Sequence, residues 1–224
     1  MFTPLATEFL AENAWRNSRD WFTAHKKDYQ TLVQEPLYAL ADALAPTVTV
    51  IDGQLLTAPK QAVSRIYRDL RFAKGGALYR EMLWISFRRD RQAFPCWPEF
   101  YFILSPETVF WGCGYYSAKA DAMAQMRALV LEGHAKFKAA DAVFAQHPEF
   151  SADGDSYKRS RFPDQPEALR RWLDKKTVCC TRYPGMDALF ADDLAARIAE
   201  DYTAMRPVYD FTVYAEECAR TETE

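Results

Sequence analysis

The segment SRIYRDLRFAKGGALYR, residues 64–80, concentrates side chains that bind anions. Five basic residues fall within it: Arg65, Arg68, Arg71, Lys74 and Arg80. Guanidinium groups this close repel one another unless a counter-charge or water lies between them. Asp69 can accept a bidentate pair of hydrogen bonds from one arginine. If the others stay partly unpaired in a hollow of the fold, an anionic ligand would relieve the repulsion.

We therefore predict a site for a phosphate- or carboxylate-bearing small molecule. Arg19 and His25, from the N-terminal region, are further candidates, and His25 could act as a general base. A histidine satisfied on a helix surface is the commoner situation. The predicted ligand-binding residues are Arg65, Arg68, Asp69, Arg71, Tyr79, Arg19 and His25. The sequence identifies no reaction, no catalytic residue, no cofactor and no oligomeric state, so enzymatic activity stays an open question.

Charge is uneven along the chain, whose formal net charge is −3. Residues 65–91 hold eight Lys/Arg against three Asp/Glu, residues 158–182 again hold eight against three, and residues 183–224 hold three against ten. The basic stretches could neutralise the acidic tail within the fold. The arginines would then be a structural network that locks the terminal helices onto a sheet, or simply a solvated face.

A binding module is the other alternative to a small-molecule site. Arginines beside sheet aromatics such as Trp84, Tyr101 and Tyr116 could hold a protein or a single-stranded nucleic acid without catalysis. The acidic net charge argues against nucleic acid.

Other chemical signals are weak. The three histidines lack ligand spacing, so no metal site is expected. The sequences GCG and KGGA do not complete a dinucleotide or phosphate loop. Cys113 could be a nucleophile if an arginine lowered its pKa, although a buried inert thiol is the commoner case. Five cysteines, an odd number, indicate free thiols and a cytoplasmic protein. No apolar run is long enough to span a membrane, and the N-terminus does not read as a secretory signal.

Helices and a sheet must position the arginine segment. Residues 4–45 have helical periodicity, with a first helix ending near Asn13, Ser18 as an N-cap and Pro36 as a kink or break. The arginine segment fits either period, and a strand through about Arg68 followed by an irregular turn is favoured. The other predicted strands are residues 47–52, 79–89, 98–105, 109–117 and 176–183, of which 98–105 and 109–117 form a hairpin.

Helices are expected over the rest of the chain. Residues 118–133, 134–147 and 166–175 are predicted as helices, residues 151–166 as a loop, and residues 188–205 and 206–219 as two closing helices. The glycines at 112 and 114 indicate a bulge or a close backbone approach. Together these elements predict one α+β domain over residues 1–224, with a mostly antiparallel sheet on which the N-terminal and C-terminal helices pack.

Four motifs resemble those of the widespread microbial family called domain of unknown function 2461. They are NSRDWFTAHKKDY, RIYRDLRFAKGGALYR, FYFILSPETVFWGCGYY and YKRSRFPDQPEALRRWLDKK, and they span nearly the whole chain in the family's order. The resemblance implies no particular activity. The family's recurring positions correspond to Arg19, Trp21, Phe22, Lys26, Arg65, Arg68, Asp69, Arg71, Phe72, Lys74 and Tyr79.

The chain departs from the family pattern near the end of the arginine segment. Gly75 and Gly76 stand where the family usually has an Asp-Lys pair, and Leu78 stands in place of a proline. Two charges are missing, so an activity that needs them would be weakened or lost.

Overall fold

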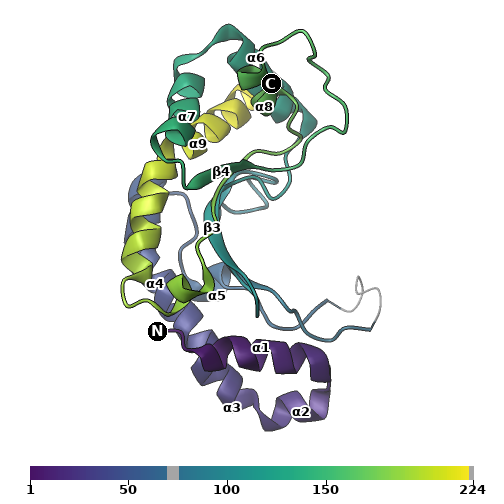
Figure 1. Ribbon diagram of the computed structural model, residues 1–224, viewed down its shortest axis with the longest axis vertical. Coiled ribbons are helices and arrows are strands. Elements are labelled where there is room, and N and C mark those ends of the chain that lie inside the picture. Colours follow the sequence, from purple (N-terminus) through teal and green to yellow (C-terminus); the bar gives the residue numbers. More distant parts are fainter. Residues whose placement is uncertain (70–75, 222–224) are drawn as a thin grey trace.

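A computed structural model describes residues 1–69 and 76–221 as a crescent (Figure 1). The helices of residues 4–29 form one end of the crescent, the helices of residues 120–173 and the last turns of the C-terminal helix form the other, and a sheet lies between them. The helices of residues 35–51 and 194–221 run along the convex side, and the opposite face of the sheet looks toward the concave side. The α+β class predicted from the sequence is confirmed.

The N-terminal helices are α1 (Pro4–Arg16), α2 (Arg19–Ala24), α3 (Lys26–Tyr29), α4 (Glu35–Ile51) and α5 (Pro59–Ala62). Ser18 caps α2 as predicted, its Oγ accepting a hydrogen bond from the Trp21 backbone N–H at 3.3 Å. α1 runs on to Arg16 rather than ending near Asn13. A π-helical turn, Gln30–Gln34, precedes the expected break, so the helical register changes just before Pro36.

The predicted strand at residues 47–52 is wrong, because α4 continues through Pro46 to Ile51. Leu44 and Val48, four residues apart, are both fully buried on the side of α4 that packs on the core. Tertiary packing of this stripe outweighs the β-propensity of the valines and the cost of an internal proline.

The sheet is fully antiparallel, with strand order β1-β2-β3-β5-β4. Its strands are β1 (Leu83–Phe87), β2 (Glu99–Leu104), β3 (Val109–Gly114), β4 (Phe150–Asp153) and β5 (Cys179–Arg182). The β2–β3 hairpin is confirmed, and its turn is closed by a hydrogen bond from Ser105 N to Thr108 O at 2.9 Å. β4 lies largely within the segment predicted to be a loop.

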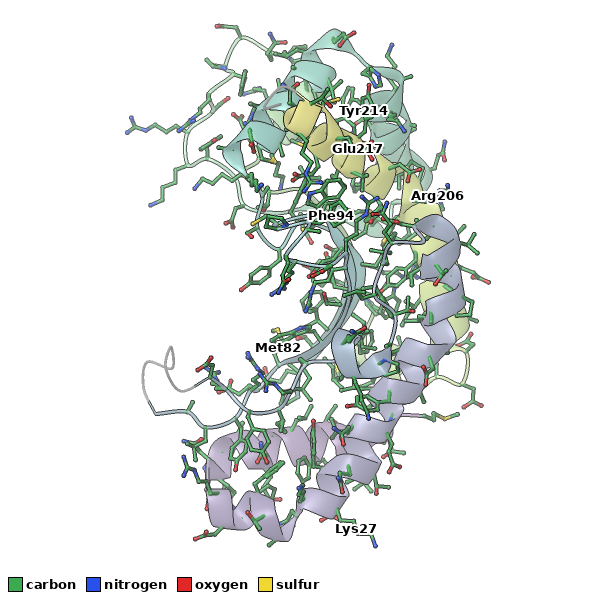
Figure 2. All side chains as sticks on the ribbon, turned by 180° about the vertical axis from the view of Figure 1, so that it is seen from behind. Lys27, Met82, Phe94, Arg206, Tyr214 and Glu217 are labelled. Carbon is green, nitrogen blue, oxygen red and sulfur yellow. The ribbon has the colours of Figure 1, made fainter. Side chains whose placement is uncertain are left out.

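Alternation along the strands gives the sheet two different faces. On the helix face, Phe100 packs on the rings of Tyr202 and Tyr209, with ring centroids 4.8 and 4.7 Å apart. The register puts Trp84, Ser86, Tyr101, Ile103 and Phe110 on the other side. We call this side the open face. Met82, just before β1, also lies on the concave side (Figure 2).

The second half of the chain forms α6 (Ala120–Glu132), α7 (Ala135–Gln146), α8 (Glu167–Leu173), a 3-10 helix (Met186–Phe190) and α9 (Leu194–Thr221). The expectation of two closing helices is wrong: α9 is continuous and contains Pro207. Arg206 marks its middle and Glu217 its last turns (Figure 2). Buried Met205, Val208 and Tyr209 flank the proline and hold the helix against the sheet. Within the described residues, no helix combines the length and apolarity needed to cross a membrane.

Candidate functional site

The arginine segment is held as an extended arm beside β1. Tyr67 pairs with Tyr79 in an isolated antiparallel bridge, flanked by hydrogen bonds from Arg68 N to Leu78 O (3.0 Å) and from Arg80 N to Ile66 O (2.8 Å). The bridge is too short to be a regular strand. The segment up to Arg68 is extended, as predicted, but it is not the regular strand that the sequence favoured.

Asn17 fixes the returning end of this arm. It adopts the left-handed conformation that ends α1 (φ 44°). Its Oδ1 accepts a hydrogen bond from Leu78 N at 2.7 Å, and its Nδ2 donates one to Gly76 O at 3.1 Å. A single side chain thus connects the corner between α1 and α2 to the arginine segment.

A pocket of about 230 Å³ lies between α2 and the arm. Its lining residues are Arg19, Phe22, Thr23, Tyr67, Arg68, Leu78 and Tyr79. The Phe22 and Tyr79 rings stack with centroids 4.8 Å apart. Three of the residues predicted from the sequence, Arg19, Arg68 and Tyr79, therefore meet in one pocket.

Arg80 follows Tyr79, which lines this pocket, and it forms no ion pair with a described residue. Its guanidinium lies 4.7 Å from the Trp84 ring centroid, and its Nε is buried without a hydrogen-bond partner within the described residues. Burial lowers the pKa of Arg80, and the positive charges of Arg68 and Arg65 lower it further. The Nε–H of Arg68 donates a hydrogen bond to the backbone oxygen of Tyr79, at 2.9 Å.

We call Arg65, Arg68 and Arg80 the arginine cluster. Among the described residues, no carboxylate lies within ion-pair distance of any of these three guanidinium groups. The charge of Asp69 acts on Arg80 and favours its protonated form. The charges of Arg68 and Arg65 both act on Arg80, and neighbouring guanidinium groups that repel one another are suited to binding an anion.

The other predicted residues have different surroundings. Arg65 and Asp69 are exposed. His25 donates from Nδ1 to the Trp21 backbone oxygen, 2.8 Å away, and its ring stacks on the Trp21 ring at 4.3 Å. The structure does not place His25 in the pocket lining. Arg71 lies outside the described residues, as do Phe72, Lys74 and Gly75.

Sequence reasoning missed a second group of polar residues on the open face. Ser86 Oγ donates to Glu99 Oε2 at 2.7 Å and accepts from Arg88 Nη1 at 3.1 Å. Burial raises the pKa of Glu99, against the lowering effect of Ser86, Arg88 and Arg91. Alternation in β1 could have placed Ser86 and Arg88 on one face, but only the strand register brings Glu99 to them.

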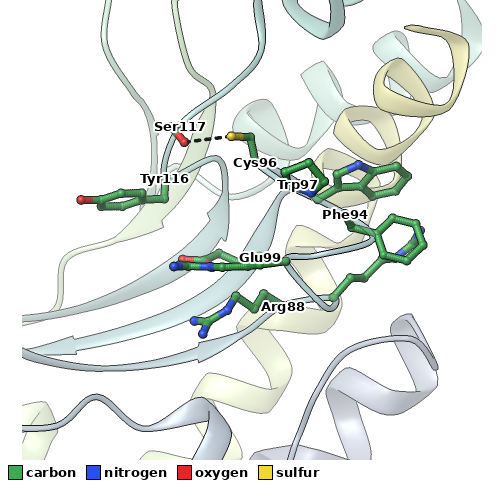
Figure 3. A pocket seen from close by; sticks show the side chains of 10 residues that line it. Arg88, Phe94, Cys96, Trp97, Glu99, Tyr116 and Ser117 are labelled. Carbon is green, nitrogen blue, oxygen red and sulfur yellow. Dashed lines mark hydrogen bonds between the residues drawn. The ribbon is translucent and has the colours of Figure 1, made fainter. Parts of the chain in front are cut away.

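Arg88 and Glu99 of this group line a pocket of about 260 Å³ (Figure 3). The polar ends of Arg88, Glu99 and Tyr116 extend toward the same side in Figure 3. Tyr116 also acts electrostatically on Arg80 and favours its protonated form. We call it the Glu99 pocket.

The cysteines offer little reactivity. All five are free thiols. Cys113 is fully buried, and burial raises its pKa well above the ordinary value, so the thiol stays protonated. Within the described residues, no group of three His, Cys, Asp or Glu side chains is arranged to hold a metal ion.

No curated protein matches the chain. The model of a family described as conserved hypothetical protein (DUF2461) matches residues 6–211, which include most of α1, the arginine segment, the whole sheet and most of α9. The chain therefore belongs to the DUF2461 family, as its four motifs indicated.

Proposed function

We propose that the protein binds an anionic small molecule, bearing phosphate or carboxylate groups, at the arginine cluster. The carrying observation is Arg80, a half-buried residue whose pKa is lowered by burial and by the charges of Arg68 and Arg65, and whose Nε has no hydrogen-bond partner within the described residues. Burying a positive charge without a partner costs free energy. A bound anion would recover that cost by accepting hydrogen bonds from Arg80 and Arg68.

The pocket beside the cluster supports this function. Arg19 and Arg68 supply positive charge, and the Tyr67 and Tyr79 rings give an apolar wall. Its volume of about 230 Å³ is suited to a small ligand or to one part of a larger ligand. The five free thiols fit a reducing compartment, so we place this function in the cytoplasm.

A thermal-shift titration with inorganic pyrophosphate and citrate tests the proposal. A ligand at 100 times its Kd adds about 2.7 kcal/mol to the free energy of unfolding. For a chain of this size, that raises Tm by about 5–11 °C. Arg80→Met should abolish the shift. Arg197→Met, which removes an exposed arginine of α9 paired with Asp193 just before the helix, should keep it.

The same variants separate ligand binding from a structural network. Without ligand, we expect Arg80→Met to be as stable as the wild type or up to about 1 kcal/mol more stable, because it removes a repelled charge. If Arg80 were instead structural, its removal would leave a buried partner without its counter-charge. The free energy of unfolding would then fall by about 3–5 kcal/mol. That loss, or an unchanged ligand shift in Arg80→Met, would contradict the proposal.

A further inference from the structure

In the Glu99 pocket, the Ser86 hydroxyl lies between the Glu99 carboxylate and the Arg88 guanidinium. Ser86 bridges Glu99 and Arg88, and neither charged group forms a direct ion pair with a described residue. The remaining Oε1 of Glu99 and the other N–H groups of Arg88 make no hydrogen bond to a described residue. Glu99 is only 9% exposed, so its side chain is nine-tenths buried. A buried carboxylate with one accepted hydrogen bond is left with unused acceptor capacity.

An aromatic ring stands beside this polar pair. Tyr116 is 85% exposed, although its neighbour Tyr115 is buried and donates to Thr212 O at 3.0 Å. Tyr115 N also donates to Val178 O at 3.0 Å, so the backbone that carries Tyr116 is anchored. The exposed ring of Tyr116 lines the pocket, where a flat ligand can stack on it.

The chemistry of the pair selects among flat ligands. A carboxylate next to a guanidinium offers an acceptor beside donors. Guanine has the matching edge, since its ring N–H and amino group are donors, while O6 and N7 accept hydrogen bonds from arginine. Adenine has a single donor group, its amino group, beside N7, and O6 is missing. The arrangement therefore suits guanine better than adenine.

The position of Arg80 connects this pocket to the arginine cluster. Arg80 stacks on Trp84, and Trp84, Ser86 and Arg88 follow one another on the open face of β1. Four residues of a strand span about 13 Å. The pocket volume of about 260 Å³ is small for a whole ligand, which fits a role in holding one part of it. The base, the sugar and the phosphate chain of a nucleotide can cover this span.

We propose that the Glu99 pocket holds the base of a guanine nucleotide whose phosphates lie at the arginine cluster. Glu99 accepts hydrogen bonds from the base, Arg88 donates to it, and Tyr116 stacks on it. This inference rests on the proposed function, because the arginine cluster supplies the phosphate site.

Isothermal titration calorimetry with GDP, ADP and pyrophosphate tests the inference. GDP should bind at least tenfold more tightly than ADP or pyrophosphate. Glu99→Gln should reduce GDP affinity by about 5- to 150-fold, the range for one bidentate base contact, and leave pyrophosphate affinity unchanged. Glu107→Gln, in the exposed turn of the same β2–β3 hairpin, should change neither affinity.

Tyr116→Ala provides a second variant that does not disturb a buried group. It should weaken GDP binding by about 5- to 150-fold through lost stacking, without changing pyrophosphate affinity. Equal affinities for GDP and ADP, or a GDP preference that survives Glu99→Gln, would overturn the inference. If pyrophosphate binds through Arg80 but GDP binds no better, the inference fails and the proposed function stands. If no anion binds, both fail.

Discussion

At the scale of single residues, two arginines that are close in sequence have different surroundings. Arg89 donates to Asp52 Oδ2 at 2.8 Å and lies 4.4 Å from the Trp97 ring centroid. Its positive charge is therefore neutralised by a carboxylate within the fold. Arg80 has the aromatic contact, but no carboxylate of a described residue lies within ion-pair distance of it. This difference is the physical basis for treating Arg89 as structural and for proposing that Arg80 binds a ligand.

Asp52→Asn should therefore destabilise the protein. Burial would raise the pKa of Asp52, but hydrogen bonds from Tyr209, Gln54 and Arg89 outweigh it and lower the pKa. Removing this charge leaves Arg89 buried without its partner, at a cost of about 3 kcal/mol in urea denaturation. Asp42→Asn, on the exposed side of α4, is the control and should be neutral. An equal stability of the two variants would refute the structural role of this pair.

Glu216 should make stability depend on pH. Burial raises its pKa to about 7 from 4.5, although Tyr115 and Lys119 favour the charged form. The folded protein then holds this proton more tightly than the unfolded chain does. The free energy of unfolding should fall as pH rises from about 4.5 to about 7, by up to about 3 kcal/mol from this group.

Urea denaturation across that pH range measures the effect. Glu216→Gln should flatten the decrease, because the side chain no longer titrates. Glu217→Gln, its exposed neighbour on α9, should leave the pH profile unchanged. Identical profiles for Glu216→Gln and wild type would show that the raised pKa is not a property of this residue.

At the scale of elements, the close packing of β3 against β5 depends on Gly112. A Cβ at Gly112 would overlap the backbone oxygen of Cys180 and lie 2.7 Å from the Tyr101 hydroxyl. Gly112→Ala should lower the free energy of unfolding by at least about 2 kcal/mol through overpacking. Gly185→Ala has no atom within 4 Å of the added Cβ and should be neutral. Thermal unfolding compares the two, and a neutral Gly112→Ala would contradict the packing.

Local patterns predicted the elements well where they agreed with burial. The β2–β3 hairpin carries alternating aromatics and a proline turn, and the close approach at Gly112 followed from its place in a strand. The patterns failed at residues 47–52 and across Pro207, where long-range packing keeps a helix intact against its local propensity. β4 was missed because its four residues form a strand only beside β5.

The candidate site was likewise predictable only where residue type and local motifs identify its residues. Arg19, Arg68 and Tyr79 were found from residue type and from the family motifs, and the pocket brings them together. Arg80 stood in the same segment, but its burial against Trp84 depends on the pairing of the arm with β1. Glu99 is 13 residues from Ser86, so no local pattern could connect them.

At the scale of the whole molecule, the acidic stretch of residues 183–224 neutralises only part of the charge of the basic stretches. Arg182, in the second basic stretch, lies 3.4 Å from Asp201 on α9. That pair shows the internal neutralisation considered from the sequence. The arginine cluster is different, because none of its three guanidinium groups pairs with an α9 carboxylate within the described residues. We propose that this positive charge attracts an anionic ligand.

The most direct test of this account is a crystal structure of the protein soaked in tungstate, a phosphate mimic with a strong anomalous signal. We predict an anomalous peak within hydrogen-bonding distance of both Arg68 and Arg80. The account would be contradicted by tungstate bound only elsewhere, or by an Arg80 guanidinium hydrogen-bonded to a carboxylate of the protein itself.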